Sequence, residues 1–237
     1  TLEHNSTMVK SEGFIIDTLT DAAIGFIEAN HERPFFCYIP YNTPHSPWQV
    51  PERYWRKYRA KGIDDPAIAC AYAMCENIDD NMGRLTAKLA EWGIEKDTLL
   101  IFITDNGPSA SNYNGDHKGK KGSVDEGGTR VPSFWRWPGV IEPGVDVDRI
   151  ANHFDILPTF AAIVGEELPE GAGPDSYNVL QALQGEALPD PERPIVFTSG
   201  GTGALAIRMG KWKLIEGQGN RGYGESRAKK PVPAPKP

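Results

Sequence analysis

The stretch Thr98-Leu99-Leu100-Ile101-Phe102-Ile103-Thr104-Asp105-Asn106-Gly107 decides the fold class. Its apolar and β-branched residues run without a break as far as Thr104, which is typical of a covered strand in an α/β protein. The run ends directly at Asp105 and Asn106. Because ligands bind at the carboxyl ends of strands in open α/β sheets, we expect these two side chains at a ligand-binding edge.

Two helices are expected upstream of this strand. Asp65 and Pro66 are a typical N-cap and first helical residue, and apolar residues then recur at every third or fourth position as far as Gly93. The spacing therefore predicts a long amphipathic helix. Nearer the N-terminus, Thr20 and the aspartate that follows it would cap a second helix, which runs to about residue 30.

The remaining elements complete a pattern of alternating helices and strands. It includes a covered strand over 35–39, a strand over 131–137, a helix over 155–164, and short strands over 195–198, 204–208 and 212–215. This order predicts an α/β fold, followed by part of a small antiparallel α+β subdomain. The domains would be residues 1–165, a surface excursion or linker over 166–194, and the start of the antiparallel subdomain over 195–237, with a proline-rich end.

The composition limits the classes of function. The 237 residues include 25 Lys+Arg and 32 Asp+Glu, which gives a net charge of −7. An acidic chain of this kind disfavours general nucleic-acid binding. No apolar run reaches the length of about 18 residues that a membrane-spanning helix needs, so we expect no membrane span.

Three features could carry chemistry. Asp105 and Asn106 offer carboxylate and amide oxygens of the kind that Ca²⁺ or Mg²⁺ prefers, although Asp-Asn-Gly is also a common turn. Residues 115–122 place three lysines, Lys121 among them, between three glycines, which suits either an anionic ligand or a flexible solvated loop. His45 stands among prolines, so it is either a rigidly held proton carrier or an incidental loop residue.

The motifs, in the order in which they occur, resemble those of the sulfatase family in the alkaline-phosphatase-like superfamily. The matching segments are PFFCYIPYNTPHSP (34–47), ENIDDNMGRL (76–85), TDNGP (104–108), GKKGSVDEGGTRVP (119–132), RWPG (136–139), DILPT (155–159) and RMGKWKLI (208–215). The resemblance implies an alkaline-phosphatase-like fold, which has a mixed sheet with helices on both faces. It also implies an arylsulfatase-like sulfuric ester hydrolase, which cleaves sulfate monoesters with a formylglycine nucleophile at a Ca²⁺ site, with Mg²⁺ as the alternative ion.

The same resemblance implies roles for individual residues. By match to the motifs, Asp105 and Asn106 would be metal ligands. Lys121 and His45 would both be substrate-binding and catalytic residues, since each would contact the sulfate and His45 would also protonate the leaving oxygen. Glu126 would belong to the scaffold that presents Lys121.

One family motif does not occur in the 237 residues. Formylglycine is made from the cysteine or serine of C/S-x-P-x-R, and the sequence contains no such segment. We therefore expect the nucleophile upstream of Thr1, expect the chain to be the C-terminal half of a sulfatase catalytic domain, and expect it to be inactive alone. The alternatives are a phosphate or phosphonate monoester hydrolase of the same superfamily, and a non-catalytic anion- or metal-binding module.

The resemblance also implies the kind of partner. A small-molecule or carbohydrate sulfate ester is the expected substrate, and neither nucleic acid nor a membrane is an expected partner. Self-association is a further expectation, through surface that the missing half would otherwise cover. Periplasmic, secreted and lysosomal compartments are typical of the family.

Overall fold

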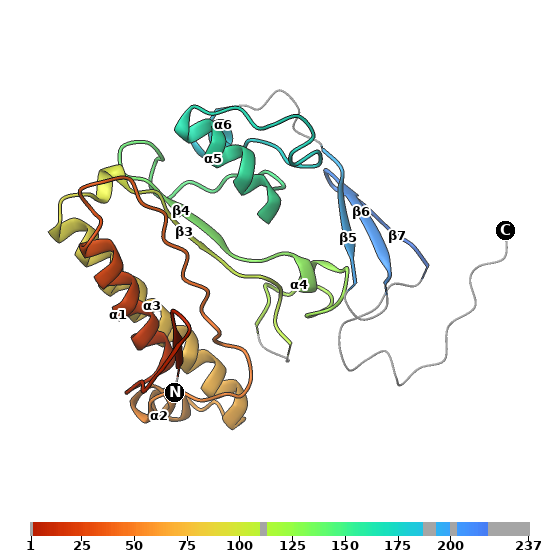
Figure 1. Ribbon diagram of the computed structural model, residues 1–237. Coiled ribbons are helices and arrows are strands. Elements are labelled where there is room, and N and C mark those ends of the chain that lie inside the picture. The colour runs from red at the N-terminus through yellow and green to blue at the C-terminus, as the bar shows by residue number, and fades with distance from the viewer. Residues whose placement is uncertain (1, 110–112, 187–192, 200–202, 218–237) are drawn as a thin grey trace. The chain divides into compact units, whose positions relative to one another are not determined.

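The computed structural model describes residues 2–109, 113–186, 193–199 and 203–217 (Figure 1). The chain divides into two compact units, Thr1–Thr98 and Leu99–Pro237. The first unit is mostly helical, and the second contains most of the strands. The candidate site residues are therefore distributed over two structural units, and each unit is described separately.

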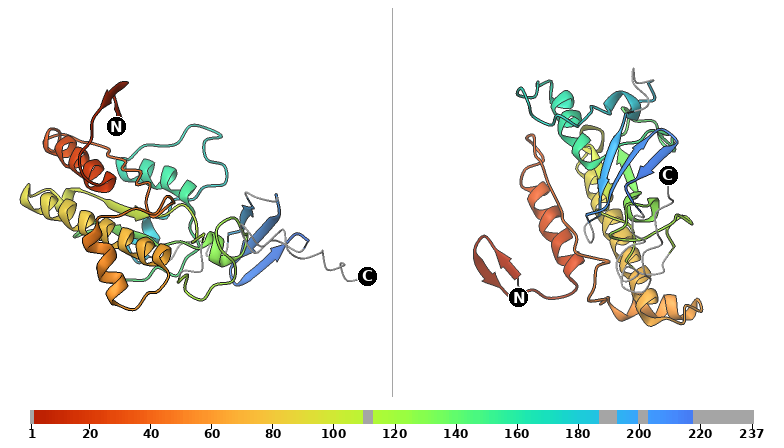
Figure 2. Two further views of the ribbon diagram at one scale, coloured as in Figure 1. Left: turned by 90° about the horizontal axis from the view of Figure 1, so that it is seen from below. Right: turned by 90° about the vertical axis from the view of Figure 1, so that its right-hand side faces the viewer.

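The first unit begins with a hairpin that the sequence pattern does not predict. Strand β1 (Leu2–His4) pairs antiparallel with β2 (Thr7–Val9), and Asn5 and Ser6 make the turn with φ angles of 49° and 63°. Figure 2 shows this hairpin in dark red beside the N-terminus. Strands of three residues are too short to show a clear alternation of apolar and polar positions, so periodicity does not reveal them.

Three helices form the rest of the first unit. They are α1 (Ile15–Glu28), α2 (Glu52–Ala60) and α3 (Pro66–Glu91), and a short 3₁₀ turn, η1 (Glu95–Asp97), follows α3. The predicted long helix is confirmed as α3. The Asp65 carboxylate accepts hydrogen bonds from the backbone N–H groups of Ala67 and Ile68, and Gly93 follows the helix with a φ of 71°. The sequence signals for its start and end are therefore the groups that cap it.

The predicted start of the first helix is wrong. Helix α1 begins at Ile15, five residues before Thr20, and the Phe14 N-cap makes no side-chain hydrogen bond. Thr20 is fully buried inside the helix, where its hydroxyl donates to the carbonyl oxygen of Ile16 at 2.7 Å. A threonine that bonds to the preceding turn has the same sequence signature as a cap, which explains the error.

The predicted strand over 35–39 is also not formed. The segment has no strand partner among the described residues, and its side chains alternate between half-buried and exposed positions. Phe36 is 72% exposed and Tyr38 is 75% exposed, so one face of the segment is not covered. An apolar run becomes a strand only when another backbone satisfies its N–H and C=O groups, and that pairing is a non-local event.

A buried polar cluster joins α1 to α3. The Asp17 carboxylate accepts hydrogen bonds from the side-chain amides of Asn77 at 2.9 Å and Asn81 at 2.8 Å. Asn77 is fully buried and Asn81 is 1% exposed. Arg84 extends the cluster by donating to Asn81 and pairing with Asp21. The motif over 76–85 is thus used for helix packing, since Asn77, Asn81 and Arg84 bind to acidic side chains of α1.

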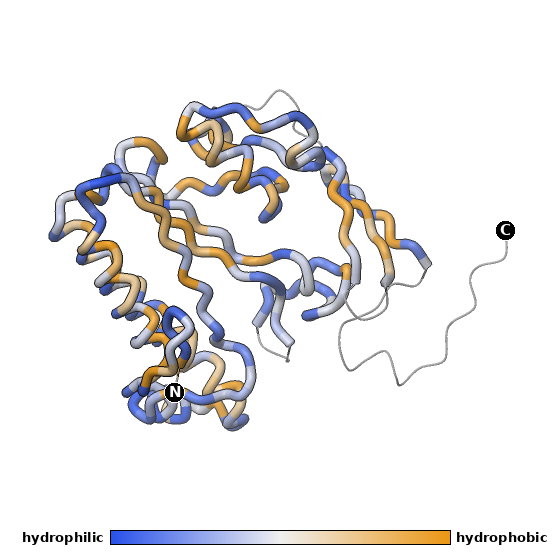
Figure 3. The backbone as a smooth tube through the Cα atoms, in the orientation of Figure 1, coloured by the Kyte–Doolittle hydropathy of each residue, from blue (hydrophilic) through white to orange (hydrophobic). Residues whose placement is uncertain are grey.

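The second unit contains two antiparallel sheets. Strand β3 (Leu100–Ile103) pairs with β4 (Ser133–Arg136), and the three-stranded sheet has the order β5-β6-β7 (Ile195–Thr198, Leu205–Met209, Trp212–Ile215). Figure 3 shows that β3 and β5 are largely hydrophobic. Short helices complete the unit: α4 (Glu126–Thr129), η2 (His153–Asp155), α5 (Ile156–Val164) and α6 (Leu180–Leu183).

The sheets differ in part from the expected architecture. The mixed content of helices and strands is confirmed, and so are the three antiparallel strands over 195–215, which Figure 2 shows in blue. The expected mixed sheet with helices on both faces is not present in the described ranges. There, every strand pair is antiparallel and no sheet has more than three strands. The reason is that β3 has a single strand partner and the segment over 35–39 is not a strand of any sheet in the described ranges.

Candidate functional site

The predicted ligand pair follows the end of β3. Thr104 separates Ile103, the last residue of the strand, from Asp105 and Asn106. Asp105 is exposed, and Asn106 is half-buried with its side-chain amide donating to the carbonyl oxygen of Gly107 at 2.9 Å. That bond uses the N–H₂ group of the amide. The carbonyl oxygen of Asn106 can therefore act as an acceptor beside the Asp105 carboxylate.

Glycines allow three backbone segments to pack together just beyond this pair. The N–H of Gly107 donates to the carbonyl oxygen of Gly128 at 3.1 Å, and a Cβ on Gly107 would overlap the carbonyl oxygen of Gly127. A Cβ on Gly127 would in turn overlap the carbonyl oxygen of Gly119. Only residues without a side chain permit such close approach, so the glycines fix the end of the β3 segment against α4 and the lysine-rich loop.

The lysine-rich loop is thereby brought to the end of β3. The backbone N–H of Lys121 donates to the carbonyl oxygen of Pro108 at 2.8 Å, and the Lys121 residue is half-buried. Pro108 follows Asn106 by two residues. The backbone of Lys121 therefore lies against the segment that directly follows Asp105 and Asn106.

Glu126 connects this cluster to the three-stranded sheet. Its carboxylate accepts hydrogen bonds from Arg208 Nη1 at 2.5 Å and from Lys213 Nζ at 2.8 Å. Burial alone would raise the pKa of Glu126. The hydrogen bond and charge of Lys213, together with the charges of Arg208 and Arg130, outweigh that effect and hold the pKa below its usual range. The expected scaffold role thus has a physical basis in these two ion pairs.

His153 supports the end of β3 from another element. Its Nε2 atom lies 2.9 Å from the carbonyl oxygen of Thr104, the residue before Asp105. The turn that carries His153 is held by the Asp155 side chain, which accepts a hydrogen bond from the Asn152 N–H at 2.7 Å. Nothing in the local sequence around His153 indicates this contact, because it joins residues that are 49 positions apart.

His45 lies in the first unit, whereas the other three predicted site residues lie in the second. The imidazole is exposed, and its Nδ1 atom is 2.7 Å from the carbonyl oxygen of Ser46. Since a carbonyl oxygen only accepts hydrogen bonds, this contact is a hydrogen bond in the forms of the imidazole that carry a proton on Nδ1. Tyr41 anchors the His45 loop, since its hydroxyl lies 2.6 Å from the hydroxyl of Thr20.

The donor atoms at the end of β3 fit a hard divalent cation. Asp105 offers carboxylate oxygens and Asn106 an amide oxygen. Ca²⁺ takes six to eight oxygen ligands, which is more than these two side chains supply. Within the described ranges, no three His, Cys, Asp or Glu side chains gather into a metal-binding group. These two residues would therefore make up part of a coordination shell.

In the same part of the chain, no helix is long and apolar enough to cross a membrane.

The fold is of mixed helix and strand content, and Asp105, Asn106 and the lysine-rich loop follow one another at the end of β3. The model of the Sulfatase family matches residues 4–166. Since this match covers more than half of the 237 residues, the chain belongs to the sulfatase family. The expectation drawn from the motifs is thus confirmed at the level of the family.

Relatives of several kinds share this similarity. An N-acetylgalactosamine-6-O-sulfatase of Bacteroides thetaiotaomicron is 30% identical over 216 residues, which are 85% of this chain and 40% of that protein. The uncharacterized sulfatase YdeN of Escherichia coli is 28% identical over 81% of this chain and 35% of its own length. A crystal structure of Ps i-CgsB in complex with k-i-k-neocarrahexaose has a TM-score of 0.82 and 31% identity over 91% of this chain and 49% of that one. The chain thus spans half or less of the length of these relatives.

Proposed function

We propose that the protein hydrolyses sulfate esters of carbohydrates and that this chain supplies part of the active site. The observation that carries the proposal is the hydrogen bond from the Lys121 backbone to Pro108, two residues after Asn106, which holds the lysine-rich loop at the end of the β3 segment. Two printed names support the substrate class, since one relative is an N-acetylgalactosamine-6-O-sulfatase and another was crystallised with k-i-k-neocarrahexaose. Arylsulfatase-like activity on small sulfate esters belongs to the same proposal.

Asp105 and Asn106 would hold the divalent cation, Ca²⁺ or alternatively Mg²⁺. When bound, such an ion stabilises negative charge on the oxygens of the sulfate ester. The glycine packing around Gly107 and Gly127 would keep the two ligands in place. Preorganised ligands stabilise a transition state better than mobile ones, because no reorganisation is needed as charge develops.

Lys121 and His45 would act on the ester directly. The Lys121 ammonium group is a compact positive charge, which suits the tetrahedral sulfate anion. As the S–O bond breaks, negative charge moves onto the leaving oxygen, and the imidazolium form of His45, which carries a proton on both ring nitrogens, would give its Nε2 proton to that oxygen and become neutral. A local positive charge is needed here because the chain as a whole carries a charge of −7 and would otherwise repel the ester.

The nucleophile is the one part of the reaction that we do not assign to these residues. The formylglycine motif C/S-x-P-x-R does not occur in the sequence, so we propose that the nucleophile comes from outside the 237 residues. It follows that the chain alone would not turn over, and that catalysis would be measured on the protein expressed from its complete coding sequence.

The experiment is an assay of sulfate release with Lys121→Ala and Lys120→Ala as a matched pair. Both lysines are half-buried in the same loop, so general effects on the loop should be similar. We expect Lys121→Ala to lower kcat by about 10²–10³-fold, the range seen when one preorganised charge-stabilising group is removed. Lys120→Ala should leave kcat nearly unchanged. Equal effects of the two variants, or faster hydrolysis of the phosphate ester of the same alcohol, would contradict the proposal.

A further inference from the structure

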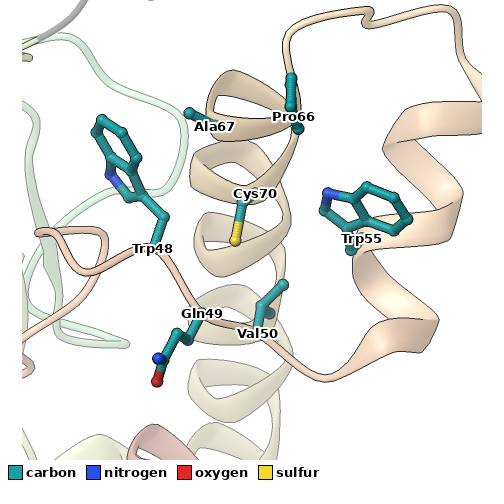
Figure 4. Close-up of a pocket in the computed structure, with 7 residues that line it drawn as sticks. All are labelled: Trp48, Gln49, Val50, Trp55, Pro66, Ala67 and Cys70. Carbon is teal, nitrogen blue, oxygen red and sulfur yellow. The ribbon is translucent and has the colours of Figure 1, made fainter.

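A pocket on the helical unit has the features of a binding site for a sugar ring. It has a volume of about 490 Å³ and is lined by Trp48, Gln49, Val50, Trp55, Pro66, Ala67 and Cys70. Figure 4 shows the two indole groups on either side of Cys70, with Trp48 in the His45 loop and Trp55 on α2. Small-molecule sites typically have volumes of about 300–1,000 Å³, so the pocket is large enough for one ring.

The lining suits a carbohydrate in particular. One face of a pyranose ring presents C–H groups, which pack against aromatic rings, while its hydroxyl groups need polar partners. Trp48 is 39% exposed, although a tryptophan of this size is usually covered, and Trp55 is half-buried. Gln49 supplies an amide that can donate and accept hydrogen bonds at the same pocket. An apolar wall with one polar group is the usual composition of a small-molecule site.

The helix beside the pocket is strongly basic. Residues 52–61 contain five basic residues and one acidic residue, in a chain whose net charge is −7. Arg53, Arg59 and Lys61 lie over the aromatic rings of neighbouring residues on this segment, at 4.7, 5.6 and 4.9 Å from the ring centroids. None of these three cations forms an ion pair with a carboxylate in the part of the chain that the structure describes.

We propose that the Trp48–Trp55 pocket and the basic residues Arg53, Arg59 and Lys61 bind a sulfated sugar unit that neighbours the one being hydrolysed. This inference rests on the proposed function. Trp48 follows His45 by three residues, so their Cα atoms are at most about 11 Å apart. An oligosaccharide whose scissile sulfate lies at His45 can therefore reach the pocket with its next units. The indole groups take the sugar ring, and Arg53, Arg59 and Lys61 attract its sulfate groups.

The test measures binding of two sulfated probes, k-i-k-neocarrahexaose and a sulfated N-acetylgalactosamine oligosaccharide, to the protein expressed from its complete coding sequence. We expect Trp48→Ala to raise the Kd of the probe that binds by about tenfold, as for the loss of an aromatic anchor. Trp48→Phe keeps an aromatic face and should recover most of the affinity. Trp212→Ala is the matched control, since Trp212 is 72% exposed on β7 and lies outside the pocket.

Further variants test whether the sulfate groups of the probe contribute to binding. The double variant Arg53→Gln/Lys61→Gln should weaken binding of the sulfated probe and leave binding of the desulfated probe unchanged. The control variant Lys10→Gln should change the affinity for neither probe. Unchanged affinity in Trp48→Ala, failure of both sulfated probes to bind, or equally tight binding of single-stranded DNA would each overturn the inference. If turnover of an aryl sulfate is absent while Trp48-dependent binding persists, the proposed function fails and the sugar site stands. If turnover is normal but the affinity for the probe does not depend on Trp48, the sugar site fails and the proposed function stands.

Discussion

Replacing Asp155 by asparagine should destabilise the second unit strongly. The Asp155 carboxylate is 1% exposed and pairs in a bidentate manner with Arg193, which is 2% exposed. One oxygen also accepts the N–H of Tyr177 at 3.0 Å, and the other accepts the N–H of Asn152 at 2.7 Å. Each carboxylate oxygen therefore faces two donors. In asparagine, an N–H₂ group takes the place of one of these oxygens. That group would face two other donors with no acceptor between them, and the Arg193 charge would be left unpaired.

The magnitude follows from the burial of both partners. Removing one member of a buried ion pair costs about 3–5 kcal/mol, because the remaining charge stays in a poorly solvated site. For a protein of 150–250 residues, each kcal/mol lowers Tm by about 2–4 °C, so a fall of about 6–20 °C is expected. Since Asp155 also closes the turn that carries His153, the contact of His153 with the Thr104 carbonyl oxygen should weaken as well.

Denaturant unfolding and amide hydrogen exchange would measure these effects together. Exchange at the N–H of Tyr177 or of Asn152 should accelerate in Asp155→Asn, because the N–H₂ group replaces the acceptor oxygen of one of these two amides. The control is the double variant Asp155→Leu/Arg193→Met, which removes both charges and should recover much of the lost stability. A loss of less than about 1 kcal/mol in Asp155→Asn, or a double variant no more stable than the single one, would refute the reasoning.

Two further predictions concern the cluster at the end of β3. Gly107→Ala should lower stability by about 1–3 kcal/mol and weaken Ca²⁺ binding, since its Cβ would overlap the Gly127 carbonyl oxygen, whereas Gly25→Ala in α1 meets no atom within 4 Å and should be tolerated. Calorimetry and thermal unfolding measure both. Because the pKa of Glu126 is lowered in the fold, its stabilising effect is present at neutral pH and is lost as the pH falls through that lowered pKa. Stability of the wild type should therefore approach that of Glu126→Gln in acid, and a constant difference at all pH values would contradict this.

Local signals in the sequence predicted the elements that depend on local contacts. The start of α3 was identifiable because Asp65 caps it with its own side chain, and its end was identifiable because Gly93 adopts a positive φ. The position of Asp105 after a strand was predictable for a similar reason, since β3 is a continuous apolar run. In each case the residues that stabilise the element lie within a few positions of it.

Features that depend on distant partners were not predictable in this way. The segment over 35–39 has the composition of a strand but belongs to no sheet in the described part of the chain, and a single sequence does not reveal which segments pair. The role of Glu126 in a scaffold was expected, yet its partner Lys213 is 87 positions away along the chain. The Trp48–Trp55 pocket combines a loop with two helices, so no single stretch of sequence shows it.

The most direct test of the central claim is a crystal structure of the protein, expressed from its complete coding sequence, with Ca²⁺ and inorganic sulfate. We expect Ca²⁺ at about 2.3–2.6 Å from oxygens of both Asp105 and Asn106, the usual distance for this ion. We also expect a sulfate oxygen within about 3.2 Å of the Lys121 ammonium nitrogen. Ca²⁺ bound away from Asp105 and Asn106, or sulfate bound without contact to Lys121, would contradict the account.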